Sequence, residues 1–149
     1  MNEKTVLAQV ATEVMAKFAL VFGDIVTADE LQPSGHKFRS IEINCEKGAE
    51  SKIGLAADEE FITMLAASSL GTNEKDPVAQ ANKYDACMEL MNLICGNFIA
   101  TFRKKGFEGK IGLPQIKEIS AEKWKELLKK DGIGFLVEGH PVYYYFEKG

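Results

Sequence analysis

Apolar residues recur at helical spacing along two stretches of the first half of the chain. Residues 3–22 carry valine, leucine and phenylalanine on one side of a helix, and residues 23–24 are expected to end it. A second helix is expected to begin after Asp58, a typical N-cap residue, and to run through Leu70 to a stop at Gly71. Both patterns predict amphipathic helices that bury one side against other elements.

The middle of the chain predicts one long helix. Asp76 stands before Pro77, so an N-cap residue precedes a proline at the first helical position. The apolar periodicity then continues to about Lys105, and Gly106 is the expected end of the helix.

Other stretches indicate β-strands. Residues 37–45 show the period of two that is typical of a strand: Arg39, Ile41, Ile43 and Cys45 alternate with Phe38, Ser40, Glu42 and Asn44. Residues 52–57 supply a second strand after a turn. Residues 109–119 are also extended, but Pro114 interrupts them, which is typical of an edge strand or a bulge.

The last third of the chain predicts a short helix and a hairpin. Ser120 is the expected cap of an amphipathic helix over residues 121–130. Residues 133–138 and 142–147 then form two strands around a turn at residues 139–141. Helices and hairpins in this order, without a regular βαβ alternation, indicate an α+β fold with a largely antiparallel sheet.

Composition and charge narrow the class of protein. Of all residues, 46% are hydrophobic and 27% are charged, which is typical of one globular domain over residues 1–149. The net charge of −4 provides no basic surface for nucleic acid. No apolar run approaches the length of a membrane span, and the N-terminus has no basic region before an apolar stretch. We therefore expect a cytoplasmic protein that binds neither membrane nor nucleic acid.

The cysteines and histidines give little support to a metal site. No CxxC pair occurs, and His36 and His140 are far apart in the sequence. Cys45 lies in an expected strand, while Cys87 and Cys95 lie in the long helix, where buried reduced thiols are the simpler interpretation. We expect no metal and no cofactor bound by this chain.

Four positions of the long helix interrupt its apolar middle. Asp85, Glu89, Asn92 and Gly96 are spaced by four, three and four residues, which places them on one narrow stripe. A helix that lies on a sheet needs one solvated side, and spacing alone favours that interpretation. Asn92 nevertheless has a low helix propensity, and Gly96 would let another surface approach closely.

The stripe resembles the motif of the CheC/CheX/FliY family of chemotaxis phosphatases. That motif has Asp or Ser, three residues, Glu, two residues, Asn, twenty-one residues and Pro. This chain has Asp85, Glu89 and Asn92 at those spacings, and twenty-one residues separate Asn92 from Pro114. Gly96 and the Gly112-Leu113-Pro114 segment also resemble the family. The resemblance implies a CheC-like fold and extends over nearly the whole chain.

The family also accounts for an internal repeat. Glu13-Val14-Met15-Ala16 in the first helix parallels Glu89-Leu90-Met91-Asn92 in the long one. Family members with two pseudo-symmetric helices carry Glu and Asn on one or both. Because Ala16 stands where the second copy has Asn92, the resemblance implies a pseudo-duplicated fold with one working helix, as in CheX.

The resemblance implies a reaction and roles for these residues. The expected activity is hydrolysis of the aspartyl phosphate of a CheY-like response regulator, whose own Mg²⁺ supplies the metal. Asn92 is expected to orient the attacking water and Glu89 to dock on a lysine of the partner. Asp85, Gly96 and Pro114 are expected to have docking or structural roles.

CheX-like proteins pair as dimers through their sheets, so a homodimer is expected. Residues 142–146 are a candidate for the pairing edge, although a core strand fits them equally well. A binding module that docks on a response regulator or a flagellar switch without hydrolysis is the main alternative function.

Overall fold

The computed structural model describes residues 2–31, 37–46, 50–102 and 110–148. An antiparallel sheet of seven strands forms its centre, in the order β1-β6-β7-β3-β2-β4, with β5 also paired to β2. The strands are β1 (Gly23–Val26), β2 (Phe38–Glu46), β3 (Glu50–Asp58), β4 (Lys110–Ile111), β5 (Gln115–Ile119), β6 (Gly132–Val137) and β7 (His140–Lys148). The α+β fold class with a largely antiparallel sheet is confirmed.

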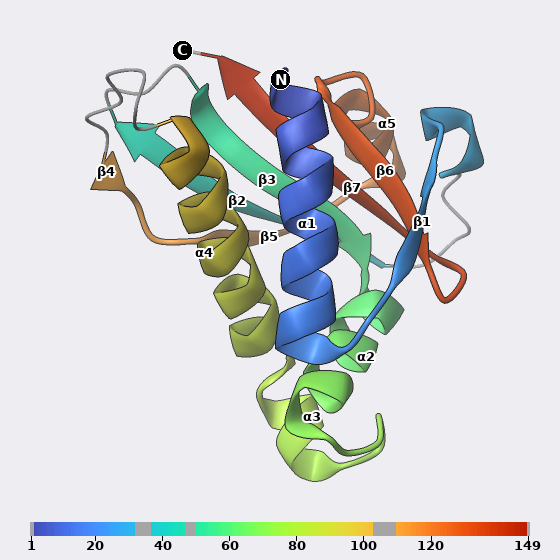
Figure 1. Ribbon diagram of the computed structural model, residues 1–149. Helices are drawn as coiled ribbons and strands as arrows, with labels where there is room; N and C mark the ends of the chain where they lie inside the picture. The colour runs from blue at the N-terminus through green and yellow to red at the C-terminus, as the bar shows by residue number, and fades with distance from the viewer. Residues whose placement is uncertain (1, 32–36, 47–49, 103–109, 149) are drawn as a thin grey trace.

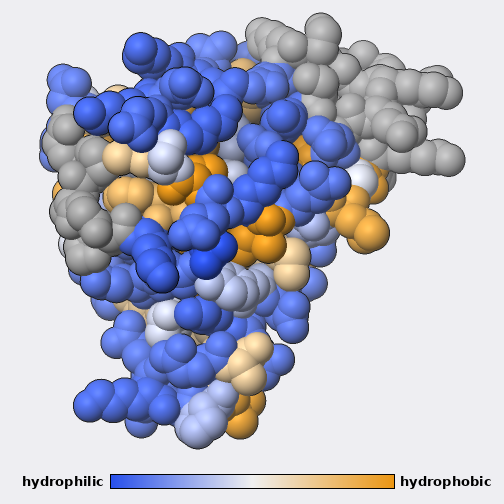
Figure 2. Space-filling model, turned by 180° about the vertical axis from the view of Figure 1, so that it is seen from behind, coloured by the Kyte–Doolittle hydropathy of each residue, from blue (hydrophilic) through white to orange (hydrophobic). Residues whose placement is uncertain are grey.

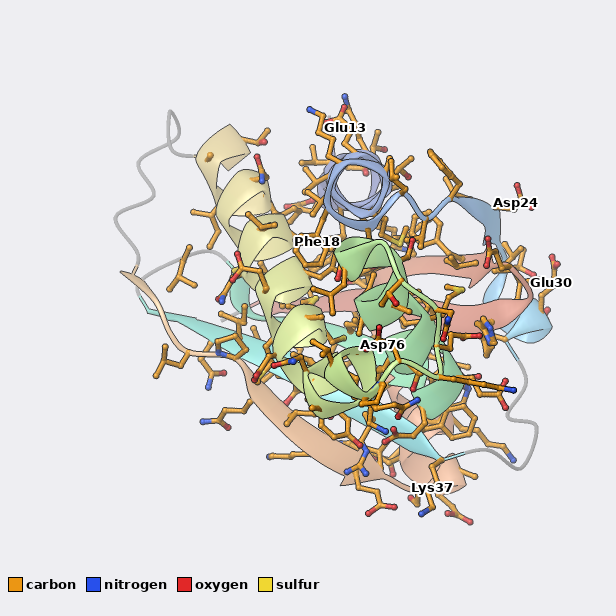
Figure 3. All side chains as sticks on the ribbon, turned by 90° about the horizontal axis from the view of Figure 1, so that it is seen from below. Glu13, Phe18, Asp24, Glu30, Lys37 and Asp76 are labelled. Carbon is orange, nitrogen blue, oxygen red and sulfur yellow. The ribbon has the colours of Figure 1, made fainter. Side chains whose placement is uncertain are left out.

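Helices cover both faces of this sheet (Figure 1). The helical elements are α1 (Glu3–Ala19), the 3-10 turn η1 (Ala28–Glu30), α2 (Glu59–Leu70), α3 (Pro77–Ala81), α4 (Lys83–Phe102) and α5 (Ala121–Leu127). The two long helices, α1 and α4, lie side by side on one face and run in opposite directions, while α5 lies behind the sheet (Figures 1 and 3). No helix of the described residues is long and apolar enough to cross a membrane.

Strand β7 has a buried core on each of its faces. Val142, Tyr144 and Phe146 point into the main core, which α1, α2 and α4 cover. Tyr143 and Tyr145 belong to a second, smaller core on the other face. Because β7 pairs with β6 on one side and β3 on the other, it is an interior strand. The suggestion that this strand forms the sheet edge is therefore wrong, and its nearly continuous aromatic run reflects burial on both faces.

The order of the strands in the sheet reflects the pseudo-duplication, in which a long helix followed by three main strands occurs twice. Helix α1 is followed by β1, β2 and β3, and helix α4 is followed by β5, β6 and β7 as well as the short β4. In each half, the strand after the long helix pairs with the hairpin of the other half: β1 pairs with β6, and β5 pairs with β2. This exchange gives two groups of three strands, β1-β6-β7 and β3-β2-β5, which meet where β7 pairs with β3. A pseudo-two-fold axis between β7 and β3 relates the two groups.

The first helix ends earlier than its apolar pattern predicts. Leu20 adopts a left-handed conformation with φ 53°, and its N–H donates to the carbonyl of Ala16. Val21 then turns into the core, where it is 3% exposed, and Gly23 opens strand β1. The expected end at residues 23–24 is therefore wrong, and β1 is a strand that the sequence pattern does not reveal.

The long middle helix is two helices. Asp76 caps α3 as predicted, its side chain accepting from the N–H of Val78. Asn82 then leaves the helical conformation, with φ −111° and ψ 12°, and its side-chain amide donates to the Val78 carbonyl. This local side-chain bond competes with the helix and separates α3 from α4. The expected helix end at Lys105 and Gly106 lies outside the described residues.

Most other predicted boundaries are close to the observed ones. Asp58 caps α2, and Gly71 ends it in the left-handed conformation, as predicted. Ser120 caps α5, which ends at Leu127, a single turn before the predicted end. The final hairpin turns at Glu138-Gly139, both with positive φ. His140 therefore opens β7, whereas the sequence pattern had placed it in the turn.

Candidate functional site

Helix α4 has one buried side and one exposed side. The buried residues pack into the main core against the sheet and α1. They are Cys87, Leu90, Met91, Ile94, Cys95, Phe98 and Ile99. Burial raises the pKa of the Cys87 thiol to about 12, so it stays protonated and unreactive at neutral pH. The interpretation of Cys87 and Cys95 as buried thiols is confirmed, whereas the side chain of Cys45 lies outside the described part of the chain.

The predicted stripe lies on the exposed side of α4. Asp85, Glu89 and Asn92 are exposed, and Gly96 is half-buried. Within the described residues, Glu89 and Asn92 have no hydrogen-bond or ion-pair partner. Two polar side chains without hydrogen bonds or ion pairs to the described residues are thus held at fixed spacing on a helix. A protein that approaches this side meets a carboxylate and an amide one helical turn apart.

Gly96 leaves open space at the end of the stripe. A Cβ built at this position meets no heavy atom within 4 Å. Glycine inside a helix costs about 1 kcal/mol relative to alanine, and no close contact within the described chain requires it here. The described residues therefore give no steric reason for a glycine at this position.

A groove between α1 and α4 runs beside the stripe. Its larger part, of about 310 Å³, is lined by residues that include Glu13, Lys17 and Asn97. A neighbouring part of about 240 Å³ is lined by Phe18 and Leu93 as well. Figure 3 shows Glu13 on the outer side of α1 and Phe18 between α1 and α4. Leu93, which is 37% exposed, follows Asn92 directly and adds an apolar contact point to this surface.

A cluster of charged and aromatic side chains fixes the start of α4. The Glu59 carboxylate accepts from Arg39 at 2.5 Å and from the Tyr84 hydroxyl at 2.7 Å, and it lies 3.2 Å from the Lys83 ammonium. Arg39 also lies over the Tyr84 ring, 5.2 Å from its centroid. Burial would raise the pKa of the Glu59 carboxyl, but the three donors outweigh it and hold that pKa below its ordinary value. The cluster joins β2, α2 and α4 immediately before Asp85.

Pro114 lies on a different element from the stripe. It stands between β4 and β5, two short strands that follow one another along β2. The N–H of Gly112 donates to the carbonyl of Asn44 at 2.8 Å, so this connection is anchored to the sheet. The connection also exposes Leu113, which is 86% accessible. No hydrogen bond within the described residues joins Pro114 to Asn92, and its role stays a prediction.

One mixed cluster has the residue types of a metal site. His140, Asp58 and Glu60 place possible ligand atoms within 4.8 Å of one another. The sequence pattern does not reveal this cluster, because only the pairing of β3 and β7 brings His140 near Asp58. However, Asp58 is the N-cap of α2 and accepts from the Phe61 N–H at 2.7 Å. The positive end of a helix dipole disfavours a cation there, so the expectation of no metal stays in place as a prediction.

Known proteins of similar sequence or structure point to one family. Residues 41–137 match the profile of the family described as chemotaxis phosphatase CheX. No curated protein sequence matches the chain.

Several solved structures share the fold, among them the following three. A CheX structure from Desulfovibrio desulfuricans has a TM-score of 0.66 and 15% identity, covering 99% of this chain and 100% of its own. CheX from Vibrio vulnificus has a TM-score of 0.67 and 14% identity, with coverages of 99% and 97%. The structure described as a CheX-CheY-BeF3-Mg²⁺ complex from Borrelia burgdorferi has a TM-score of 0.69, 18% identity and 99% coverage of both chains. The family profile covers more than half of the chain, and the chain therefore belongs to the CheX family of chemotaxis phosphatases.

Proposed function

We propose that this protein hydrolyses the aspartyl phosphate of a CheY-like chemotaxis response regulator. The observation that carries the proposal is the exposed Glu89 and Asn92 pair on α4, one turn apart and without partners among the described residues. Membership of the CheX family supports the same activity. The CheX of the Borrelia burgdorferi complex is described as bound to CheY with BeF3 and Mg²⁺, which fits a CheY-like partner.

Asn92 positions the attacking water in this proposal. Hydrolysis breaks the bond between phosphorus and the aspartyl oxygen, and it yields the carboxylate and inorganic phosphate. The reaction needs a water in line with that bond and neutralisation of the phosphoryl charge. An amide offers both a donor and an acceptor without adding a negative charge that would repel phosphate. Because Asn92 projects from a packed helix, its amide is held at a fixed place once the two proteins dock.

Glu89 fixes the register of the complex. Its carboxylate, one turn before Asn92, pairs with a lysine of the response regulator. The open surface at Gly96 and the apolar Leu93 allow the partner to approach the helix closely. Asp85 acts structurally at the start of the stripe, and Pro114 shapes the loop between β4 and β5. The Mg²⁺ that neutralises the phosphoryl charge belongs to the partner, so the stripe needs no metal ligand of its own.

A homodimer in the cytoplasm belongs to the same proposal. The interior position of β7 leaves β1 at one edge of the sheet and β4 with β5 at the other. Strand β1 also carries the exposed Ile25, and Phe22 just before it is 67% exposed. Pairing through sheet edges therefore uses these outer strands.

A binding module without catalysis is the second candidate function. It would use the same stripe to dock on a response regulator or a flagellar switch component. The intact Asn92 favours the phosphatase, because docking alone does not need an amide in the middle of a helix.

The test is phosphate release from a phosphorylated, Mg²⁺-loaded receiver domain of the same organism. We expect the protein to accelerate release from the receiver and to leave a simple phosphate monoester such as p-nitrophenyl phosphate untouched. Acceleration with the monoester would indicate an unspecific phosphatase. Binding to a receiver without any acceleration would replace this proposal by the binding module.

A further inference from the structure

A hollow lies on the face of the sheet opposite to α1 and α4. It has a volume of about 390 Å³, and its wall includes Ser40 and Glu42 of β2, Lys117 of β5, Lys123 of α5, Lys130 and Glu147. We call it the α5 hollow. Its volume is in the range of sites for small molecules. Figure 2 looks onto this face and shows mostly hydrophilic side chains, with a smaller apolar area among them.

The packing of α5 explains why this part of the sheet stays uncovered. Trp124 of α5 stacks on Phe38 with ring centroids 4.4 Å apart, and its indole N–H donates to the carbonyl of Leu31 at 2.9 Å. The helix is thus held over the Phe38 end of β2. Ser40 and Glu42 lie further along the same face of that strand, since alternate residues of a strand point to one side. Helix α5 is only seven residues long and leaves this part of β2 open as the floor of the hollow.

Ser40 is an unusual residue for such a floor. It is 4% exposed, and within the described residues its hydroxyl has no hydrogen-bond partner. Among the described residues, only the Tyr144 hydroxyl is both fully buried and without a partner, so the Ser40 hydroxyl faces the space of the hollow. Since Ser40 lines the hollow, its hydroxyl can bond to a water or to a ligand that occupies the hollow.

The charges of the wall indicate what the hollow attracts. Four lysines and three glutamates line it, in a chain whose net charge is −4. Glu147 pairs with Lys130 and lies 3.9 Å from Lys52, so these two lysines are partly neutralised. Lys117 has no ion-pair partner within the described residues. Lys123 pairs only with Glu126 of its own exposed helix surface, at 3.7 Å. On the side formed by β5 and α5, two lysines and one glutamate, Glu118, line the hollow, so this side has a net positive charge.

The opposite part of the floor offers a fixed acceptor. The Tyr145 hydroxyl donates to Glu42 at 2.6 Å, and Lys52 lies 3.6 Å from the same carboxylate. Burial, followed by this hydrogen bond, raises the pKa of Tyr145 well above its ordinary value, so the phenol remains a donor at all ordinary pH values. Glu42 is thereby oriented, and its remaining lone pairs can accept a hydroxyl group from a ligand.

We propose that the α5 hollow binds a small metabolite that carries one phosphate or carboxylate group and at least one hydroxyl group. The anionic group lies between Lys117 and Lys123, the two lysines of the wall whose positive charges are least neutralised by carboxylates of the protein. A ligand hydroxyl reaches Glu42, and the Ser40 hydroxyl donates to the ligand. This site is separate from the α4 stripe, and the proposal does not depend on the phosphatase activity.

The test uses amide chemical shifts of the isotope-labelled protein during titration with glucose 6-phosphate, with gluconate and with neutral glucose. We expect saturable shifts at Ser40, Lys117 and Lys123 with at least one of the two anionic probes, at constant ionic strength, and none with glucose. If both anions bind, the site recognises the negative charge of either group. If only one binds, the ligand class carries that group, a phosphate for glucose 6-phosphate or a carboxylate for gluconate. No saturable shift with either anion would overturn the proposal and leave a water-filled hollow.

Matched variants make the test specific. Replacing Lys117 and Lys123 with alanine should abolish the shifts, whereas replacing Lys125 and Lys129, which lie outside the hollow, should not. Ser40→Ala should weaken binding by at least about threefold, the value of one hydrogen bond, and should leave the melting temperature unchanged or higher. Equal weakening by both lysine pairs would show unspecific charge attraction and would also overturn the proposal.

Discussion

Helices α1 and α4 occupy equivalent places in the two halves of the fold, but only one carries the motif. Both lie on the same face of the sheet and bury a full apolar side in the same core. Their exposed sides differ: Glu13 corresponds to Glu89, but Ala16 stands where α4 has Asn92. The fold thus requires the buried sides of both helices, and the exposed positions are left for function.

The ends of the two helices differ as well. The position in α1 that corresponds to Gly96 is Leu20, which is 73% exposed and ends the helix in a left-handed conformation. In α4 the helix continues beyond Gly96 to Phe102. A partner could approach α4 closely at this point, whereas α1 presents a bulky side chain and a helix terminus. Helix α1 therefore differs from α4 both in the missing amide and in the surface around it.

The largest effect within this comparison is expected from the two glutamates. Glu89→Ala should weaken the affinity for a phosphorylated receiver about tenfold, because the carboxylate that pairs with the partner's lysine is removed. Glu13→Ala, at the equivalent place on α1, should change it less than twofold. Calorimetric or fluorescence titration of both variants checks this difference. Equal losses would mean that the receiver docks on both helices.

A smaller and opposite pair of effects is expected at Gly96. Gly96→Ala should stabilise the protein by up to about 1 kcal/mol, because alanine is the better helix former and its Cβ meets nothing in the chain. The same change should weaken receiver binding severalfold, because the methyl group occupies the approach surface. Ala100→Gly, on the exposed side of the same helix, is the matched control, and it should lower stability without changing affinity. Chemical denaturation and titration measure the two quantities, and unchanged binding in Gly96→Ala would remove the reason given for the glycine.

A pH-dependent effect is expected at the cluster that fixes the start of α4. Because the folded-state pKa of Glu59 is lowered, its contribution to stability is present above its ordinary pKa of 4.5 and is lost as the pH falls through the folded-state value. Glu59→Gln should therefore cost about 1 kcal/mol at neutral pH and progressively less below pH 4.5. Glu126→Gln, in an exposed ion pair, should cost almost nothing at either pH. Urea denaturation at a series of pH values checks both, and a pH-independent cost at Glu59 would contradict the assignment.

The smallest effect is expected from restoring the missing amide. Ala16→Asn recreates the Glu and Asn pair on α1, yet it should leave phosphatase activity within about 20% of the wild type, because Leu20 and the helix end remain. A second change, Leu20→Gly, tests whether the approach surface is what α1 lacks. Phosphate release by the single and the double variant measures this, and a doubling of activity in Ala16→Asn alone would show that the amide was the only difference.

Local chemistry made much of this fold predictable. Asp58 and Ser120 cap the helices that the sequence pattern assigns to them, and Asp76 caps α3, the first part of the expected long helix. The motif stripe was equally predictable, because helical geometry alone places residues at these spacings on one side of a helix.

Features that depend on distant parts of the chain were not predictable in the same way. Strand β1 is four residues long and has no alternation, and it exists because β6 offers an edge. The break at Asn82 comes from a single side-chain bond within an otherwise helical sequence. The α1–α4 groove and the α5 hollow depend on the packing of elements from both halves of the chain, so Leu93 and Ser40 gain their significance only in the folded protein.

The most direct test of the central claim compares two exposed asparagines of α4, Asn92 on the stripe and Asn97 beside the α1–α4 groove. Asn92→Ala and Asn97→Ala should both fold and should both bind a BeF3-activated receiver with nearly the affinity of the wild type. Asn92→Ala should lose phosphate release by about a hundredfold, because the attacking water is no longer positioned, while Asn97→Ala should retain it. Equal activity of the two variants would contradict the proposed role of Asn92.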